Sequence, residues 1–329
     1  MNRQWWFVSP PRGKLTPQQF ELRRVPDPVP AEGEALVRNL YISLMPGNRA
    51  WMQGETYRSQ LATGQPMPGR ALGEVVASNS PDFQKGDLVE TNLGWQDCCV
   101  ASAAQIYRRN AARPAAHLLG ILGSSAITAY FGLLHVGRPR AGETILVSAA
   151  AGGVGSLVAQ LAKIAGCRVV GVAGGPGKCE WLRTEVGVDA AVDYKADDFA
   201  AALHAACPDG ADLFFDNTAG PVLEAALDAM KVGGRIVCCG ATAQYDSETL
   251  PRGTAGLPLK LIVKSLTMTG FVMHNYRDQW PEAEARLWGW FEQGRIKPLY
   301  HIVEGLENTP AALIGLLAGE NRGMTLVQV

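Results

Sequence analysis

Short apolar runs alternate with helix-spaced apolar positions along the chain from residue 143 to residue 293. Residues 145–147 (Ile-Leu-Val) form a continuous apolar run, which predicts a strand buried on both faces. A loop of small residues follows, and apolar residues then recur at helical spacing at Leu157, Val158, Leu161 and Ile164. This segment therefore predicts a strand, a glycine-containing turn and a helix in direct succession.

The same alternation continues toward the C-terminus. Further strands are predicted over residues 168–173, 190–193, 213–216, 235–239 and 265–273. Helices are predicted over residues 178–186, through an Ala-rich stretch ending at 206, and over 221–230 and 279–293. Strands and helices in this order indicate an α/β fold with a parallel, doubly wound sheet.

The segments on either side of residues 143–293 have a different pattern of apolar and polar residues. Strands are predicted over residues 19–25, 34–42, 73–78 and 88–91, which is typical of a small barrel or folded sheet. A helix over 118–134 is expected to lead into the alternating region. After Pro298, a strand at 300–303, a helix at 311–318 and the run 325–329 do not extend the alternation. We therefore expect a doubly wound domain over 121–297, inserted into a β-rich domain made of 1–120 and 298–329.

Gly152 and Gly155 lie in the turn between the first strand and its helix. A helix N-terminus presents unpaired N–H groups and partial positive charge, and glycine lets a pyrophosphate approach the backbone. Ala150 stands where the G-x-G-x-x-G fingerprint has its first glycine, so the motif is incomplete. Because strand, turn and helix are in register, the segment favours nucleotide binding over an ordinary turn.

The second strand of the alternating region indicates which nucleotide. NAD-specific sites carry an acidic residue near the end of this strand, about twenty residues past the glycine turn, where it binds the ribose 2′-OH. No Asp or Glu occurs between Arg168 and Lys178. A carboxylate would repel a 2′-phosphate and Lys178 would attract one, so the charges favour NADPH over NADH.

Composition excludes several other classes of protein. The chain has 329 residues, 47% of them hydrophobic and 19% charged, with a net charge of −1, which argues against a nucleic-acid partner. No apolar run long enough to span a membrane and no signal peptide is expected. The 7 cysteines form no C-x-x-C motif and fit free thiols in the cytoplasm. The 5 histidines show no metal-ligand spacing.

Blocks spread over the whole chain resemble one family. In chain order they are residues 2–5, 37–44, 94–97, 128–133, 149–156, 193–195, 215–217 and 319–321, with the closing strand. They resemble the medium-chain dehydrogenase/reductase superfamily, and within it the zinc-free branch of leukotriene B4 dehydrogenase/prostaglandin reductase, alkenal double-bond reductase and curcumin reductase. The resemblance implies a Rossmann sheet inserted in a GroES-like barrel domain, NADPH as cofactor and a homodimer.

The resemblance also implies cofactor contacts at matching positions. Pyrophosphate contacts would come from Gly152, Gly153, Val154 and Gly155. Lys178 and Tyr194 would flank the adenosine 2′-phosphate, and Asn217 would be a further NADP contact. Contacts nearer the nicotinamide would come from Cys239, Gly240, Tyr245, Phe271, Val272, Met273 and Asn321. By itself, the sequence around Asn217 and Asn321 is equally typical of loop capping.

The resemblance to the zinc alcohol dehydrogenases of the superfamily is incomplete. Those enzymes carry a cysteine after an early strand and a later Gly-His-Glu motif, whereas residues 43–48 contain no cysteine and Arg70 and Ala71 replace the His and Glu. We therefore expect no metal. Without a Lewis acid, alcohol oxidation is disfavoured, but hydride addition to an α,β-unsaturated aldehyde or ketone needs only donors to the enolate oxygen. Tyr245 is the expected catalytic donor, and a half-buried loop tyrosine is the alternative interpretation.

Two departures from the family pattern lie on the substrate side, according to the resemblance. Gly47 replaces a tyrosine, and residues 124–126 (Ser-Ser-Ala) replace Met-Pro-Gly. They predict a wider or differently shaped pocket for a bulky enone. Two other functions stay open at this point: NADPH:quinone reduction, and NADPH binding without catalysis.

Overall fold

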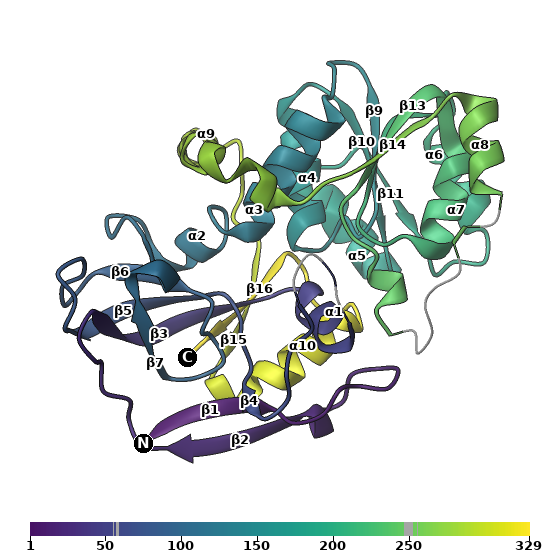
Figure 1. Cartoon of the computed structure of the whole chain (residues 1–329). Helices are drawn as coiled ribbons and strands as arrows, with labels where there is room; N and C mark the ends of the chain where they lie inside the picture. Colours follow the sequence, from purple (N-terminus) through teal and green to yellow (C-terminus); the bar gives the residue numbers. More distant parts are fainter. Residues whose placement is uncertain (55, 57–58, 247–252, 255) are drawn as a thin grey trace. The chain divides into compact units, whose positions relative to one another are not determined.

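The computed structural model describes residues 1–54, 56, 59–246, 253–254 and 256–329 (Figure 1). Within this part, the chain forms two compact units. Residues Ser124–Leu299 form one, here called the α/β unit, and Met1–Gly123 with Tyr300–Val329 form the other, here called the β-rich unit. The expected domain limits, at 120/121 and 297/298, stay predictions about where each domain folds independently.

The α/β unit contains six parallel strands in the order β11-β10-β9-β12-β13-β14. In chain order they are β9 (Thr144–Val147), β10 (Arg168–Ala173), β11 (Ala190–Asp193), β12 (Ala211–Asp216), β13 (Met230–Cys238) and β14 (Thr267–Gly270). Strand order reverses between β9 and β12, which are hydrogen-bonded neighbours. Ligands of doubly wound sheets bind beyond the carboxyl ends of the strands at this reversal point.

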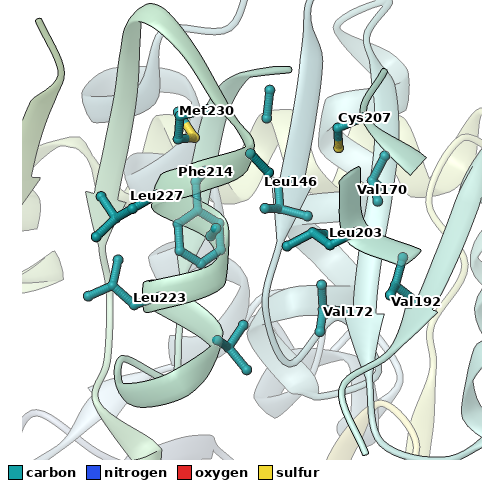
Figure 2. Packing of buried hydrophobic residues seen from close by; sticks show 14 of the residues in the cluster. Leu146, Val170, Val172, Val192, Leu203, Cys207, Phe214, Leu223, Leu227 and Met230 are labelled. Carbon is teal, nitrogen blue, oxygen red and sulfur yellow. The ribbon is translucent and has the colours of Figure 1, made fainter. Parts of the chain in front are cut away.

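Helices connect these strands. They are α3 (Ser124–Tyr130), η3 (Phe131–Gly137), α4 (Gly153–Ile164), α5 (Pro176–Trp181), η4 (Leu182–Val186), α6 (Phe199–Ala206), α7 (Gly220–Ala229), η5 (Thr242–Gln244), α8 (Leu257–Lys264), η6 (Met273–Gln279) and α9 (Trp280–Glu292). Figure 2 shows Leu146 of β9, Val170 of β10 and Phe214 of β12 packed with Leu203 of α6 and Leu227 of α7. Because the central strands are covered by helices, their apolar runs are continuous rather than alternating.

The β-rich unit is built on antiparallel pairing. Its strands are β1 (Asn2–Phe7), β2 (Phe20–Val25), β3 (Glu34–Leu44), β4 (Gln65–Pro66), β5 (Ala71–Ser78), β6 (Leu88–Thr91), β7 (Cys98–Ser102), β8 (Tyr107–Arg108), β15 (Tyr300–Glu304) and β16 (Met324–Gln328). Its helices are η1 (Pro17–Gln19), α1 (Gly47–Gln53), η2 (Ala103–Gln105), α2 (Ala115–Leu119), η7 (Leu306–Asn308) and α10 (Thr309–Leu317). Strands β2, β1 and β4 form one sheet, and the larger sheet has the order β15-β16-β3-β5-β6-β8 with β7 on β3.

The C-terminal segment is part of this second sheet. Strand β16 pairs with β3 in antiparallel orientation and with β15 in parallel orientation. Leu306 and Leu313 of this segment share a buried cluster with Phe7, Ile42 and Trp95. The structure therefore places residues 300–329 in the same compact unit as the N-terminal segment.

Two expected elements are wrong in part. The single helix over residues 118–134 is divided into α2, α3 and η3, with a break at Gly120–Gly123. A Cβ at Gly123 would clash with Leu119 O, and one at Gly120 would lie 2.5 Å from the Tyr300 ring, so tertiary packing rather than apolar spacing shapes this segment. The strand expected over 265–273 is shorter, because β14 ends at Gly270 and Met273 begins η6.

Candidate active site

The glycine turn leads directly from β9 into α4. Gly152 is the N-cap, and the 12-residue helix begins at Gly153. A Cβ at Gly155 would lie 2.8 Å from Ala150 Cα and would clash with Ala149 O, so only glycine lets the helix approach the turn this closely. Ala149 has a positive φ of 46°. The unpaired N–H groups of the first turn, with the helix dipole, suit this end of α4 to an anion.

A buried hydrogen-bond network joins β9 to β12 at the reversal point. Ser148 Oγ donates to Asp216 Oδ1 at 3.0 Å, and Asn217 N donates to Ser148 Oγ at 2.8 Å. Asn217 Nδ2 also donates to Ser148 O at 2.7 Å. The predicted cofactor residue Asn217 is therefore held by the strand that precedes the glycine turn.

Asp216 organises the chain beyond this network. Its carboxylate accepts hydrogen bonds from Thr218 N at 2.9 Å and Ala219 N at 3.0 Å. Burial raises the pKa of Asp216, while these hydrogen bonds and the one from Ser148 act in the opposite direction. The segment after β12 is thus fixed by a buried acid that the sequence did not single out.

The loop after β13 is hydrogen-bonded to the segment after β12. Cys239 N donates to Asp216 O at 2.8 Å, and Thr242 Oγ1 donates to Asn217 O at 3.3 Å. Farther along, Ala241 N donates to the Tyr245 hydroxyl oxygen at 3.5 Å. The structure therefore brings four predicted site residues onto two adjoining loops: Asn217, Cys239, Gly240 and Tyr245.

Burial disfavours the thiolate form of Cys239 in this loop. Burial, with smaller contributions from Asp216 and Cys238, raises the pKa of Cys239 to about 12. The thiol therefore stays protonated at neutral pH, and thiolate chemistry is disfavoured. Cys239 can contribute backbone groups and packing.

The predicted contacts after β14 form a separate packed group. The rings of Phe215 and Phe271 are 6.5 Å apart in an edge-to-face arrangement. Met273 Sδ accepts a hydrogen bond from Thr128 Oγ1 at 3.3 Å, and Met273 O accepts one from Trp280 Nε1 at 3.3 Å. Phe271, Val272 and Met273 thus follow the carboxyl end of β14, which pairs with β13.

A second predicted group lies where β10 and β11 end. Tyr194 follows β11, and Lys178 lies in α5, which follows β10. Tyr194 is 46% exposed, and its neighbour Lys195 is also exposed. Lys195 is not among the site residues predicted from the sequence, although the dipeptide Tyr194-Lys195 brings a second cation to this corner.

The remaining predicted positions serve local structure in their own units. In the β-rich unit, Asn321 Nδ2 donates to Gly323 O at 2.8 Å, so this side chain caps its own turn. Gly47 begins α1, and a Cβ there would lie 3.4 Å from the Trp51 ring, an ordinary contact. In the α/β unit, Ser124 begins α3, and its buried Oγ has no hydrogen-bond partner among the described residues.

The reversed strand order, the glycine turn and the acid-free end of β10 define a dinucleotide-binding oxidoreductase domain. A family model described as the N-terminal domain of oxidoreductase matches residues 3–108, and one described as zinc-binding dehydrogenase matches residues 153–289.

Named relatives match nearly the whole chain. The putative NADP-dependent oxidoreductase YfmJ of Bacillus subtilis is 41% identical over 97% of this chain and 95% of its own. The NADPH-dependent curcumin reductase of Escherichia coli is 38% identical over 100% and 97%. The crystal structure of CurA from Vibrio vulnificus with NADPH has a TM-score of 0.95 and 38% identity, covering 99% of each chain. The chain therefore belongs to the medium-chain dehydrogenase/reductase family, in the branch of these reductases.

The zinc in one family model's description does not suit the residues of this chain. Arg70, at the position where a zinc relative would have histidine, forms an ion pair with the buried Glu90, which also faces Arg109 at 3.7 Å. A guanidinium is no metal ligand and would repel Zn²⁺. Among the residues that the structure describes, no group of three or more His, Cys, Asp or Glu side chains could hold a metal ion. No described helix is long and apolar enough to cross a membrane.

Proposed function

We propose that this protein reduces the carbon–carbon double bond of α,β-unsaturated aldehydes or ketones with NADPH, without a metal. The observation that carries the proposal is full-length relationship to reductases of such compounds. Besides the curcumin reductase, they include prostaglandin reductase 1 of Bos taurus, 38% identical over 96% of this chain, and the NADP-dependent 2-alkenal reductase of Nicotiana tabacum, 38% identical over 90%.

NADPH, when bound, supplies the hydride, and the protein positions and polarises the reactants. We infer that the turn Gly152–Gly155 binds the pyrophosphate and that Lys178 and Tyr194 bind the 2′-phosphate. Loop residues after β12, β13 and β14 then contact the nicotinamide half. Two adjoining loops held by Asp216 can keep this half of the site rigid.

Tyr245 is the proposed hydrogen-bond donor to the substrate carbonyl oxygen, on which negative charge develops as hydride adds to the β-carbon. Tyr245→Phe should lower kcat by about tenfold or more, because an oxyanion donor acts mainly in the transition state. Its Kd for NADPH should change much less than kcat, because the ring of residue 245 is retained beside the cofactor. An unaltered kcat would remove Tyr245 from the mechanism.

The reaction is tested by NADPH oxidation with a panel of enones and a panel of quinones, followed by product analysis. NADPH deuterated at its transferred hydrogen should give a saturated carbonyl labelled at the β-carbon. Turnover of quinones alone would support quinone reduction instead, and tight NADPH binding without any turnover would indicate a non-catalytic protein. Lys178→Ala should weaken NADPH far more than NADH, and equal losses would contradict the phosphate role.

Gly47 offers a test of the pocket shape. A Cβ at this position meets only ordinary contacts with Trp51 and Met45. If a wider pocket accounts for bulky substrates, Gly47→Tyr should shift kcat/KM toward small alkenals. An unchanged substrate profile would contradict the proposed pocket.

We infer further that the protein is a cytoplasmic homodimer. Strand β14 is an edge of the parallel sheet, and Leu259, Ile262 and Val263 of α8 are 65%, 73% and 68% exposed. Exposed edge strands and apolar side chains are common sites of self-association. All seven cysteines are unpaired, as in reducing compartments. Sedimentation should give a dimer mass that Ile262→Glu reduces to a monomer mass, and a monomeric native protein would contradict the proposal.

A further inference from the structure

One carboxylate accepts hydrogen bonds from both turns that follow β10 and β11 (strands labelled in Figure 1). Asp193, the last residue of β11, accepts hydrogen bonds at Oδ1 from Gly175 N at 2.8 Å and from Lys195 N at 2.9 Å. Tyr194 N donates to Ala173 O at 3.0 Å. Asp193 therefore holds the backbone of Lys195 beside the end of β10.

This arrangement fills the space beside Gly174. A Cβ built on Gly174 would lie 2.9 Å from Lys195 Cε and 2.9 Å from Tyr194 Cε1. Carbon atoms do not approach so closely, so a side chain at this position would push aside the ends of these two exposed side chains. Gly174 directly follows β10, in the region where an NAD-specific site carries its acid. An acidic side chain at this position would therefore meet Tyr194 and Lys195.

Lys195 also contributes charge. Its Nζ lies 6.0 Å from the centroid of the Tyr194 ring, and among the described residues its ammonium forms no ion pair. A phosphate dianion has three acceptor oxygens and can accept charge-assisted hydrogen bonds from more than one cation. The flat face of Tyr194 and two lysines thus suit a phosphorylated ribose.

We propose that Lys195 determines cofactor specificity by binding the 2′-phosphate of NADPH, and that with Tyr194 it occupies the space beside Gly174 that the acidic side chain of an NADH-selective site would take. Asp193 is the positioning residue that holds this packing. The inference rests on the proposed function, because it takes NADPH as the cofactor.

The charge is tested with adenosine fragments that lack the nicotinamide. Calorimetry with 2′,5′-ADP and 5′-AMP compares the native protein with Lys195→Met, which keeps the methylene stem beside Gly174 and removes the ammonium. We expect 2′,5′-ADP to bind about tenfold more weakly and 5′-AMP to bind equally well. Lys297→Met, an exposed lysine of the same unit, is the matched control and should change neither. Unchanged 2′,5′-ADP affinity in Lys195→Met overturns the inference.

The steric part is tested by placing the acid in two backgrounds. Gly174→Asp alone should weaken NADPH and NADH together, since the new side chain displaces Tyr194 and Lys195. The same substitution combined with Tyr194→Ala and Lys195→Ala should reverse the preference to NADH. A reversal of the cofactor preference to NADH by Gly174→Asp alone would show that Tyr194 and Lys195 do not oppose an acid at this position. Circular dichroism and melting temperature establish that each variant is folded.

The test of Asp193 must distinguish a positioning role from a general loss of folding. Asp193→Ala should raise KM for NADPH with little change in kcat, and Asp193→Asn, which keeps an oxygen acceptor, should restore it. Equal KM values for Asp193→Ala and the native protein would overturn the positioning role. A native protein that binds 2′,5′-ADP no better than 5′-AMP would contradict the cofactor assignment itself, whereas a selective native protein with a neutral Lys195→Met contradicts only this inference.

Discussion

The α/β unit and the β-rich unit build their sheets in opposite ways. In the α/β unit, six parallel strands end at a common edge, so the loops that follow them meet there. In the β-rich unit, strands from both ends of the chain pair mostly in antiparallel orientation. A parallel sheet therefore gathers a site from short segments directly after each strand, and such a site can be located from local sequence. The β-rich unit instead depends on segments that are far apart in the chain.

The largest expected effects on stability come from truncating one buried side chain in the core of each unit. Phe214→Ala in the α/β unit should lower the free energy of unfolding by about 3–5 kcal/mol, and Leu313→Ala in the β-rich unit by about 2–5 kcal/mol, because each leaves a cavity in a fully buried cluster. Denaturant unfolding followed by circular dichroism measures both. If Leu313→Ala were neutral, the C-terminal segment would not support the β-rich core.

Close backbone contacts give the next test. Gly155→Ala would force a Cβ against Ala149 and Ala150, and Gly73→Ala would force one to 2.6 Å from Arg38 O. Each should cost about 1–3 kcal/mol of stability. Only Gly155→Ala should also abolish tight NADPH binding, as measured by fluorescence titration. Loss of NADPH binding in a folded Gly73→Ala variant would show that NADPH binding does not depend on the α/β unit alone.

The smallest expected effect is a pH dependence confined to the α/β unit. Asp189 accepts hydrogen bonds from Lys163 Nζ at 2.8 Å and Val169 N at 2.7 Å. Burial raises the pKa of Asp189, but these bonds outweigh it, so the pKa lies below its ordinary value. A lowered pKa stabilises the fold above the unfolded-state pKa, and the stabilisation is lost as the pH falls through the folded-state pKa.

Asp189→Asn should therefore cost less than about 1 kcal/mol at pH 7, because the ion pair is partly exposed, and less still at pH 3. Urea unfolding at both pH values measures the difference, with the exposed Asp197→Asn as the control. A larger loss at pH 3 than at pH 7 would contradict the assignment.

Local patterns predicted the central strands well and the connecting segment badly. Strands β10 and β11 begin and end where the sequence predicts, because short apolar runs buried on both faces can form little else. The helix expected over 118–134 was wrong because glycines at 120 and 123 permit contacts that helical spacing does not encode. Strands β1 and β7 and helices α1 and α8 were not predicted. In α8, Leu259, Ile262 and Val263 are exposed, so burial does not explain the apolar residues at these three positions.

For the candidate site, the sequence could locate the glycine turn, the missing acid and Lys178, and the resemblance supplied the remaining positions. It could not identify Ser148 or Asp216, because their hydrogen bond joins segments that are distant in the chain. Lys195 was missed because its place beside Gly174 depends on the pairing of β10 with β11. The buried Asp216 lay in one of the family blocks, yet nothing in a single sequence distinguishes such an acid from an exposed one. The roles of the predicted contact residues stay predictions until the variants above are measured.

Strand β16 pairs with β3, so the sheet that the N-terminal segment begins is completed only when the C-terminal segment is present. During translation, residues 124–299 leave the ribosome with all six of their strands, whereas the N-terminal segment has already emerged without two strands of its sheet. Domains generally fold as units as they are synthesised. A nascent chain arrested before residue 300 would therefore carry all six strands of the sheet of the α/β unit but lack β15 and β16 of the β-rich unit, with the edge of β3 open to chaperones or to other strands.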